Sequence, residues 1–265
     1  MPRILGLDIG PVAVRGTLVT TALRRTEVHQ YLEVPLRQVS DPRGRAEALR
    51  EAVETLTSQI KRAPDGIIAE LDGREGASLR VVELPARAVK SLGQILPNYL
   101  EDVLPFAVEE AVVDYQEIER TGDKIRLLAT AAPKANVQTR LEELRQARVD
   151  PKEFAVGAAA LDGLVPILPQ LDTPGPFVIV DVEEDATDIC ILRNGRCELA
   201  RTLSVGLREV RAGQRAALEA QLRHTLAGYR ANDGPPPEAV LLAGDATQFP
   251  NAAEWLGEVC QAECR

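Results

Sequence analysis

The stretch FVIVDVEEDATDICILRNGRCELARTLSVG, at residues 177–206, decides the fold of this chain. It contains three apolar runs, at 177–182, 187–192 and 198–203. An acidic turn separates the first two runs, and Asn194-Gly195 separates the last two. Because Asn and Gly both tolerate the positive φ of a type I′ turn, this dipeptide is a strong hairpin signal. The stretch therefore predicts three consecutive strands, and the first, almost wholly apolar, is expected to be buried on both faces.

The N-terminus repeats this plan. The run RILGLDIG, at residues 3–10, is apolar and carries Asp8 and Gly10 at its end. Two strand-like runs follow it, at 12–20 and 28–34, just as two runs follow the strand that carries Asp181. Two copies of one plan, far apart in one chain, indicate an internal duplication.

Composition and charge narrow the class of protein. The chain has 265 residues, of which 45% are hydrophobic and 27% charged, as in a globular protein of one large domain or two smaller ones. Its net charge of −9 argues against a general nucleic-acid binder, which needs a basic surface. No apolar run reaches the roughly 18 residues of a membrane span, and the first residues do not resemble a signal peptide.

Four cysteines are few for this length. With Asn194-Gly195 as the hairpin turn, Leu192 is expected opposite Cys197. Cys190 is then expected opposite Leu199, so that the two thiols are diagonal neighbours. We expect reduced, mostly buried thiols, as in a cytosolic protein. Neither histidine has ligand spacing around it, and we therefore expect no metal site.

Hydrophobic periodicity predicts the helices. Residues 45–61, 134–148 and 207–229 repeat apolar side chains at helical spacing, the last as one long helix. Residues 154–168 are largely apolar and predict a buried helix. Between 97 and 111, Pro105 is expected to end one helical segment and to start another.

Four stretches in a fixed order carry a resemblance to a known family. They are LDIGPVAVRG (7–16), LEDVLPFAVEEAVVDYQEI (100–118), IVDVEEDATDICILRNGRCELARTLSVG (179–206) and VLLAGDATQFPNAAEWLGE (240–258). In this order the chain resembles the cytoplasmic domain of type II secretion system protein L (the GspL family) and its relative, the type IV pilus assembly protein PilM. The resemblance implies an α/β fold of the actin-like ATPase type, a duplicated RNase H-like fold. The first lobe is then 1–172, with an inserted subdomain at about 72–132, and the second lobe is 173–265.

The resemblance also implies a nucleotide pocket, and this sequence departs from it in all three loops. The corresponding residues are Asp8, Gly10, Arg15, Asp181, Glu183, Thr187, Gly244 and Asp245. Residues 11–13 replace small hydroxyl residues, and Pro11 lacks an N–H donor. Glu183 stands at a glycine position, and Asp245 follows Gly244 where a second glycine is usual. We therefore expect a degenerate pocket with no catalytic residue, cofactor or metal. Nucleotide binding without turnover is the first alternative.

The function implied is that of a non-catalytic adaptor at the cytoplasmic face of the bacterial inner membrane. In the secretion family, such a domain recruits the secretion ATPase (protein E) through that ATPase's N-terminal region and couples it to pseudopilus assembly. The implied partners are this ATPase, the inner-membrane proteins M and F and a second copy of the chain. Membrane contact is expected only through a segment beyond Arg265.

Two alternatives to this function stay open. One is a PilM-like adaptor that binds a peptide of a membrane partner in the type IV pilus. The 63 positions from Asp181 to Gly244 leave no room for the extra subdomain usual in PilM, which favours the secretion family. The other alternative is an active actin-like ATPase or sugar kinase.

An acidic segment supplies the candidate docking surface. Its residues are Tyr99, Glu101, Asp102, Phe106, Glu109, Glu110 and Asp114. The acids would attract a basic partner over a distance, and the two aromatic side chains would anchor it if they are exposed. The alternative is a solvated helix that merely covers the core.

Overall fold

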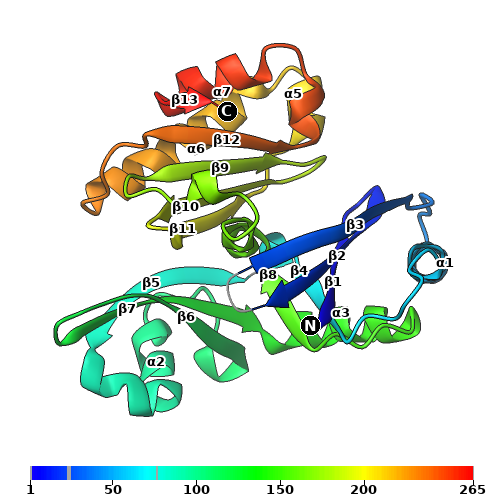
Figure 1. Cartoon of the computed structure of the whole chain (residues 1–265), viewed down its shortest axis with the longest axis horizontal. Helices are drawn as coiled ribbons and strands as arrows, with labels where there is room; N and C mark the ends of the chain where they lie inside the picture. Colours follow the sequence, from blue (N-terminus) through cyan, green and yellow to red (C-terminus); the bar gives the residue numbers. More distant parts are fainter. Residues whose placement is uncertain (1, 23–24, 76, 265) are drawn as a thin grey trace. The chain divides into compact units, whose positions relative to one another are not determined.

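The computed structural model describes residues 2–22, 25–75 and 77–264. The chain forms two compact units, one from Met1–Asp72 and Lys134–Val156 and the other from Gly73–Pro133 and Gly157–Arg265. Each unit is built on a five-stranded mixed sheet, and the second unit also holds a three-stranded sheet (Figure 1). No helix in the described part of the chain is long and apolar enough to cross a membrane.

The first unit packs two helices against its sheet. The strands are β1 (Arg3–Ile9), β2 (Ala13–Ala22), β3 (Arg25–Pro35), β4 (Gly66–Leu71) and β8 (Glu153–Val156), in the order β3-β2-β1-β4-β8. The helices are α1 (Pro42–Ser58) and α3 (Lys134–Gln146). Asp41 caps α1 by accepting the N–H of Gly44 at 2.8 Å. Ala48, Ala52 and Leu56, spaced four apart, bury one face of α1 in the core.

The second unit repeats the plan and confirms the three strands predicted in residues 177–206. Its strands are β9 (Phe177–Val182), β10 (Thr187–Arg193), β11 (Arg196–Leu203), β12 (Ala239–Gly244) and β13 (Glu263–Cys264), in the order β11-β10-β9-β12-β13. Strand β9 is buried on both faces, as expected. Val178 and Val180 join the core beneath α6 (Arg215–Ala231) and α7 (Ala252–Cys260), whereas Phe177 and Ile179 join a core on the opposite face.

The inserted subdomain belongs to the second unit. Strands β5 (Ser78–Pro85), β7 (Lys124–Pro133) and β6 (Ala111–Thr121) form its sheet in that order, and α2 (Leu92–Glu101) covers one face. On the other face, Leu79 and Leu128 share a core with Phe177 and Ile179, next to the short helix α4 (Gly157–Ala160). The compact units thus differ from the predicted lobes, which grouped residues 72–132 with the first lobe, because this apolar face is buried against β9.

Three helix predictions were wrong in detail. Residues 207–229 form two helices, α5 (Leu207–Arg211) and α6, because Gly213 adopts a φ of 81° between them. Residues 154–168 begin with β8, which pairs with β4, and continue in short helical turns. Pro105 separates no two helices, since α2 ends at Glu101 and only a single 3-10 turn (Val108–Glu110) follows it.

The cysteine hairpin differs from the prediction by one residue. Leu192 pairs with Cys197 as predicted, but Cys190 pairs with Ala200 instead of Leu199. The register shifts between Ile191 and Leu192, a β-bulge that inserts one residue into the ladder. The two thiols are still offset neighbours, with their sulfur atoms 3.5 Å apart. Contact with Cys197 and burial raise the pKa of Cys190, which keeps this thiol protonated.

Candidate functional site

In the first unit, residues of the predicted nucleotide loop form hydrogen bonds and ion pairs with one another and with neighbouring strands. Asp8 and Arg15 pair across β1 and β2, and Arg15 Nη1 donates to Asp8 Oδ2 at 3.2 Å. Through Nε, the same guanidinium donates to Glu33 Oε2 at 3.3 Å. The N–H of Gly10 donates to the carbonyl of Ala13 at 3.0 Å. The structure therefore brings Asp8, Gly10 and Arg15 together, and each already has a partner within the unit.

Glu33 is a member of this cluster that sequence reasoning missed. It lies opposite Arg15 in the register of β2 and β3, which no local motif reveals. The Tyr31 hydroxyl donates to the same carboxylate oxygen at 2.7 Å. This hydrogen bond, together with the charge of Arg15, holds the pKa of Glu33 below its ordinary value. Glu33 is therefore charged at neutral pH, and Arg15 faces two carboxylates at once.

In the second unit, strand pairing brings Asp181, Thr187 and Gly244 together. Thr187 and Gly244 both pair with Val182, the residue after Asp181. The buried Thr187 hydroxyl donates to the carbonyl of Val205 at 2.7 Å, so this side chain serves the sheet. Gly244 approaches Asp181 so closely that a Cβ would lie 2.3 Å from Asp181 Oδ1. Asp245, the next residue, opens a 3-10 turn (Asp245–Gln248).

The acidic turn between β9 and β10 is bonded through its main chain. Glu183 donates its N–H to the carbonyl of Ala186 at 3.0 Å. The carbonyls of Glu183 and Glu184 accept the N–H groups of Leu207 and Arg208 at 2.8 and 2.9 Å. These two N–H groups belong to the first turn of α5, which has no partner for them within the helix. The carbonyl groups of the turn therefore satisfy the free N–H groups at the start of α5, as a helix cap does.

The side chains of the acidic turn form ion pairs. Arg211, at the end of α5, pairs with Glu184. Arg74, in the 3-10 turn Gly73–Glu75, brings Nη1 within 2.8 Å of Asp185 Oδ2. Sequence reasoning identified the carboxylates but missed both arginines, since Arg74 lies 111 positions from Asp185.

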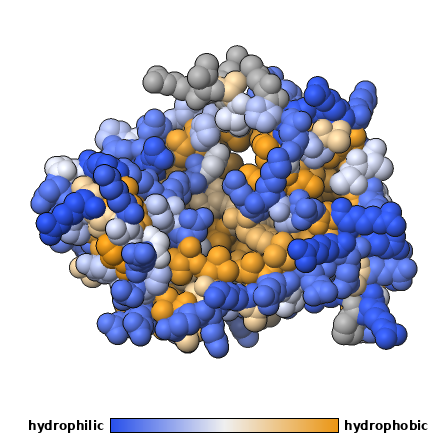
Figure 2. Space-filling view, turned by 90° about the horizontal axis from the view of Figure 1, so that it is seen from below, coloured by the Kyte–Doolittle hydropathy of each residue, from blue (hydrophilic) through white to orange (hydrophobic). Residues whose placement is uncertain are grey.

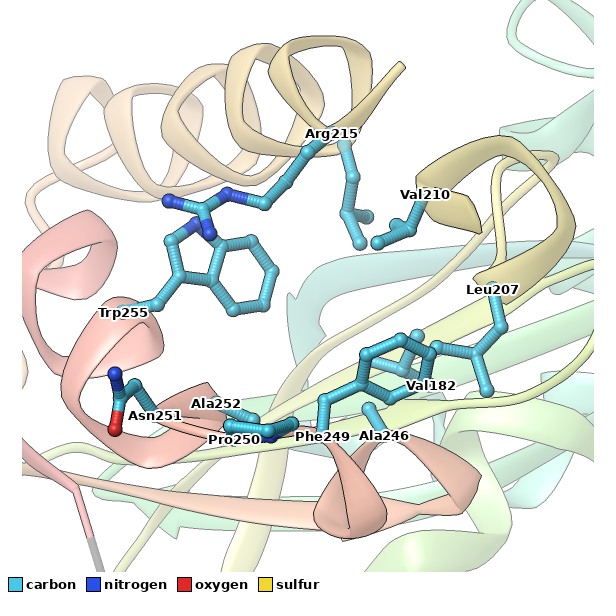
Figure 3. Close-up of a pocket in the computed structure, with 11 residues that line it drawn as sticks. Val182, Leu207, Val210, Arg215, Ala246, Phe249, Pro250, Asn251, Ala252 and Trp255 are labelled. Carbon is cyan, nitrogen blue, oxygen red and sulfur yellow. The ribbon is translucent and has the colours of Figure 1, made fainter. Parts of the chain in front are cut away.

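A pocket opens beside this turn, between α5, α6 and the segment 246–255 (Figure 3). It encloses about 420 Å³ of empty space, part of it open to solvent, and its walls are mainly apolar. The Arg215 guanidinium lies 5.2 Å from the centre of the Trp255 ring. Trp255 Nε1–H and Arg215 Nε both donate to Glu219 Oε1, at 2.8 and 3.1 Å. The polar groups of Arg215 and Trp255 are thus engaged by Glu219.

The predicted docking residues lie at the end of α2, in the loop that follows it and at the start of β6. Tyr99, Glu101, Asp102, Glu109, Glu110 and Asp114 are exposed. Phe106 is half-buried in the core cluster of Leu96 and Leu100, so the condition that it be exposed as an anchor is not met. Tyr99 is 52% exposed and is available as the aromatic anchor.

The segment that carries these acids, residues 99–115, is also rich in exposed apolar side chains. Of the eight large hydrophobic residues exposed in the described chain, Tyr99, Val103, Val112 and Tyr115 fall within 17 positions. Among the described residues, Glu101, Asp102, Glu110 and Asp114 form no ion pair. We call these four acids, with Glu109 and the four apolar residues, the acidic patch. Figure 2 shows hydrophilic residues over much of the surface that it draws, with hydrophobic residues also exposed there.

A buried carboxylate, also missed by sequence reasoning, joins the inserted subdomain to the second sheet. Glu198, on β11, has a side chain only 5% exposed. Its carboxylate lies 2.7 Å from Arg193 Nη2 and 3.2 Å from Arg126 Nη1 of β7. Its other oxygen accepts the Tyr229 hydroxyl at 2.7 Å. Arg126, Arg193 and Tyr229, from three different elements, therefore share the carboxylate of Glu198.

Comparisons with known proteins identify the fold. The model of the family "Type IV pilus assembly protein PilM" matches residues 6–212. Among solved structures, the chain is similar to one in a PilM–PilN type IV pilus biogenesis complex, with a TM-score of 0.82 and 19% identity over 99% of this chain and 88% of that one. It is also similar to the cytoplasmic domain of EpsL, an inner-membrane component of the type II secretion system of Vibrio cholerae. That TM-score is 0.54, with 13% identity over 91% of this chain and 82% of that one.

A third similar structure extends the fold assignment beyond these two systems. It is a Bacteroides thetaiotaomicron protein of unknown function with an actin-like ATPase fold, with a TM-score of 0.51 and 11% identity over 100% of this chain and 91% of that one. No curated protein sequence matches the chain. The predicted actin-like ATPase fold is confirmed, and so is the resemblance to the domains of pilus and secretion systems.

Proposed function

The chain belongs to the family of type IV pilus assembly protein PilM, and from this membership we propose that it is a non-catalytic adaptor at the cytoplasmic face of the bacterial inner membrane. The adaptor holds a membrane protein of an assembly platform and recruits the ATPase that drives the assembly. The family match over residues 6–212 is the observation that carries the proposal.

The structural comparisons support a membrane protein as one partner in this proposal. The similar PilM chain is in a complex with PilN. The EpsL domain comes from an inner-membrane component of a secretion system. An adaptor that makes no chemical change acts only through its surfaces, and a specific interface buries about 800 Å² on each side. The proposal therefore requires a docking surface.

We assign the acidic patch to the ATPase. Four of its carboxylates form no ion pair among the described residues, and four apolar side chains of the same segment, residues 99–115, are exposed. Some acids elsewhere on the surface, such as Glu51, Glu54 and Glu83, are paired with arginine or lysine. Exposed apolar area supplies affinity, and unneutralised acids attract a basic partner.

Binding of the ATPase's N-terminal region is expected to weaken with salt, mainly through a slower association rate. The Glu109→Lys/Glu110→Lys variant should weaken binding by about tenfold without lowering the melting temperature, because both residues are exposed. Binding kinetics over a salt series measure both effects. Glu254→Lys/Glu258→Lys is the matched control, since it makes the same charge change on exposed positions of α7. Salt-independent affinity and normal binding by the Glu109/Glu110 variant would place the ATPase elsewhere.

A type II secretion adaptor is the second candidate. The span between β11 and β12 holds only α5 and α6, which agrees with the short form expected for secretion protein L. In this version the partners are the secretion ATPase, protein E, and the inner-membrane proteins M and F, and the chain helps to couple the ATPase to pseudopilus assembly. Parallel binding assays with the N-terminal regions of a pilus ATPase and a secretion ATPase distinguish the two candidates.

The purified chain is expected to hydrolyse no ATP above background. Glu183 replaces a phosphate-binding glycine, and the Arg15 guanidinium is held between two carboxylates. A phosphate-release assay with Mg²⁺ and ATP measures turnover, and Asp8→Ala is the control for contaminating ATPases. Turnover that disappears in the Asp8→Ala variant would instead support the enzyme alternative.

A further inference from the structure

The actin-like fold implies a nucleotide, and the residues present do not fit one. A nucleotide site of this kind offers backbone N–H groups and a cation to the phosphates, and carboxylates to hydrated Mg²⁺. In this chain the cation and the backbone N–H groups at these positions are bonded within their own unit. Each unit shows this independently.

In the first unit, the cation and the amide are both in use. The Arg15 side chain is only 16% exposed and lies between Asp8 and Glu33. A phosphate at this guanidinium would have to compete with both carboxylates. The N–H of Gly10 is bonded to Ala13, and Pro11 has none to offer.

In the second unit, the acidic turn is held by hydrogen bonds and ion pairs with other parts of the same unit. Its carbonyls hold the first N–H groups of α5, and its side chains hold Arg74 and Arg211. Gly206 allows the turn to pack this closely against the start of α5. A Cβ at Gly206 would lie 2.6 Å from the carbonyl oxygen of Glu183 and from the nitrogen of Ala186. The acidic turn therefore packs directly against α5 and the two arginines.

We propose that residues 183–186 act as an internal ligand that replaces the nucleotide of the fold family. The carboxylates of Glu184 and Asp185 hold Arg211 and Arg74, and the turn keeps its conformation without any bound phosphate. A nucleotide is excluded because its phosphates would meet these carboxylates at short range. The adaptor therefore works independently of ATP. This inference goes beyond the proposed function, since it holds whichever partner is bound.

Hydrogen exchange at the amides of Glu183, Leu207 and Arg208 tests the proposal directly, since these N–H groups hold the turn. In the unmodified chain, neither MgATP nor magnesium pyrophosphate is expected to change exchange at these amides or the melting temperature. In the Glu184→Gln/Asp185→Asn variant, exchange should become about tenfold faster, because the turn opens more often. Glu254→Gln/Glu258→Gln, on exposed positions of α7, is the matched control and should leave these amides unchanged.

Two results would overturn the proposal. Slower exchange or a higher melting temperature of the unmodified chain with MgATP would show a functional nucleotide site. Unchanged exchange in the Glu184/Asp185 variant would show that the ion pairs do not hold the turn. If that variant does not fold, Arg74→Gln and Arg211→Gln test the same pairs from the cation side. The ATPase-binding assay uses a different surface, and so failure of one proposal is distinguishable from failure of the other.

Discussion

Gly244→Val is expected to lower the free energy of unfolding by about 3 kcal/mol or more. Gly244 has a φ of 76° and a ψ of −166°, a conformation restricted almost entirely to glycine. A Cβ at this position would also lie 2.3 Å from Asp181 Oδ1 and 2.6 Å from the carbonyl oxygen of Val182. Because β9 and β12 pair at this point, valine must push two central strands apart. Chemical denaturation followed by circular dichroism measures the loss.

Gly10 provides the comparison within the same fold. The sequence predicts that Gly10 and Gly244 both need a positive φ or a close backbone approach. The structure confirms this for Gly244, but the prediction was wrong for Gly10, which lacks a positive φ and where an added Cβ would lie 3.4 Å from the nearest atom. Gly10→Ala should therefore cost less than about 1 kcal/mol, well below Gly244→Ala. Equal losses in the two alanine variants would contradict this account.

The strands of the second sheet were predictable because their signals are local. Alternating and continuous apolar runs, with Asn194-Gly195 between two of them, depend only on neighbouring residues. The bulge between Ile191 and Leu192 has no such signal, and it moved the partner of Cys190 from Leu199 to Ala200. A single inserted residue decides pairing beyond it, and sequence periodicity does not fix where it occurs.

The helix predictions failed where tertiary packing overrides local preference. Pro97 lies inside α2, where proline normally disrupts a helix. Leu92, Leu96 and Leu100 are spaced four apart and all three are at most 2% exposed, so their burial against the sheet stabilises the helix around Pro97. The apolar run from 154 predicts a helix, but its start belongs to β8, which pairs with β4, and only the tertiary structure brings these two strands together.

The residues of the candidate nucleotide site also fall into two groups, those marked by local sequence signals and those brought in by tertiary contacts. The residues at strand ends, among them Asp8, Asp181 and Gly244, could be predicted because the duplicated strand plan marks them. Their partners Glu33, Arg74 and Arg211 could not, because each is brought in by strand register or by a distant turn. The acids of the docking surface were visible in the sequence, whereas the burial of Phe106 was not.

Glu198→Ala is expected to cost about 3–5 kcal/mol, because it removes one partner from a buried ionic cluster. The Glu198 side chain is 5% exposed and accepts from Arg126, Arg193 and Tyr229. Burial and the hydrogen bond to Glu198 raise the pKa of Tyr229, so that its hydroxyl keeps the proton it donates. The two arginine side chains are about 30% exposed, and water therefore recovers part of the loss.

The control for Glu198 is an ion pair on the surface of the inserted subdomain. Glu117 is 45% exposed and pairs with Arg120, so Glu117→Ala should cost less than about 1 kcal/mol. A double-mutant cycle with Tyr229→Phe measures the coupling between the hydroxyl and the carboxylate, expected at about 1–3 kcal/mol for a hydrogen bond to a charged group. Similar small losses for Glu198→Ala and Glu117→Ala would mean that the apolar core of Leu79, Leu128 and Phe177 alone holds the subdomain to the second sheet.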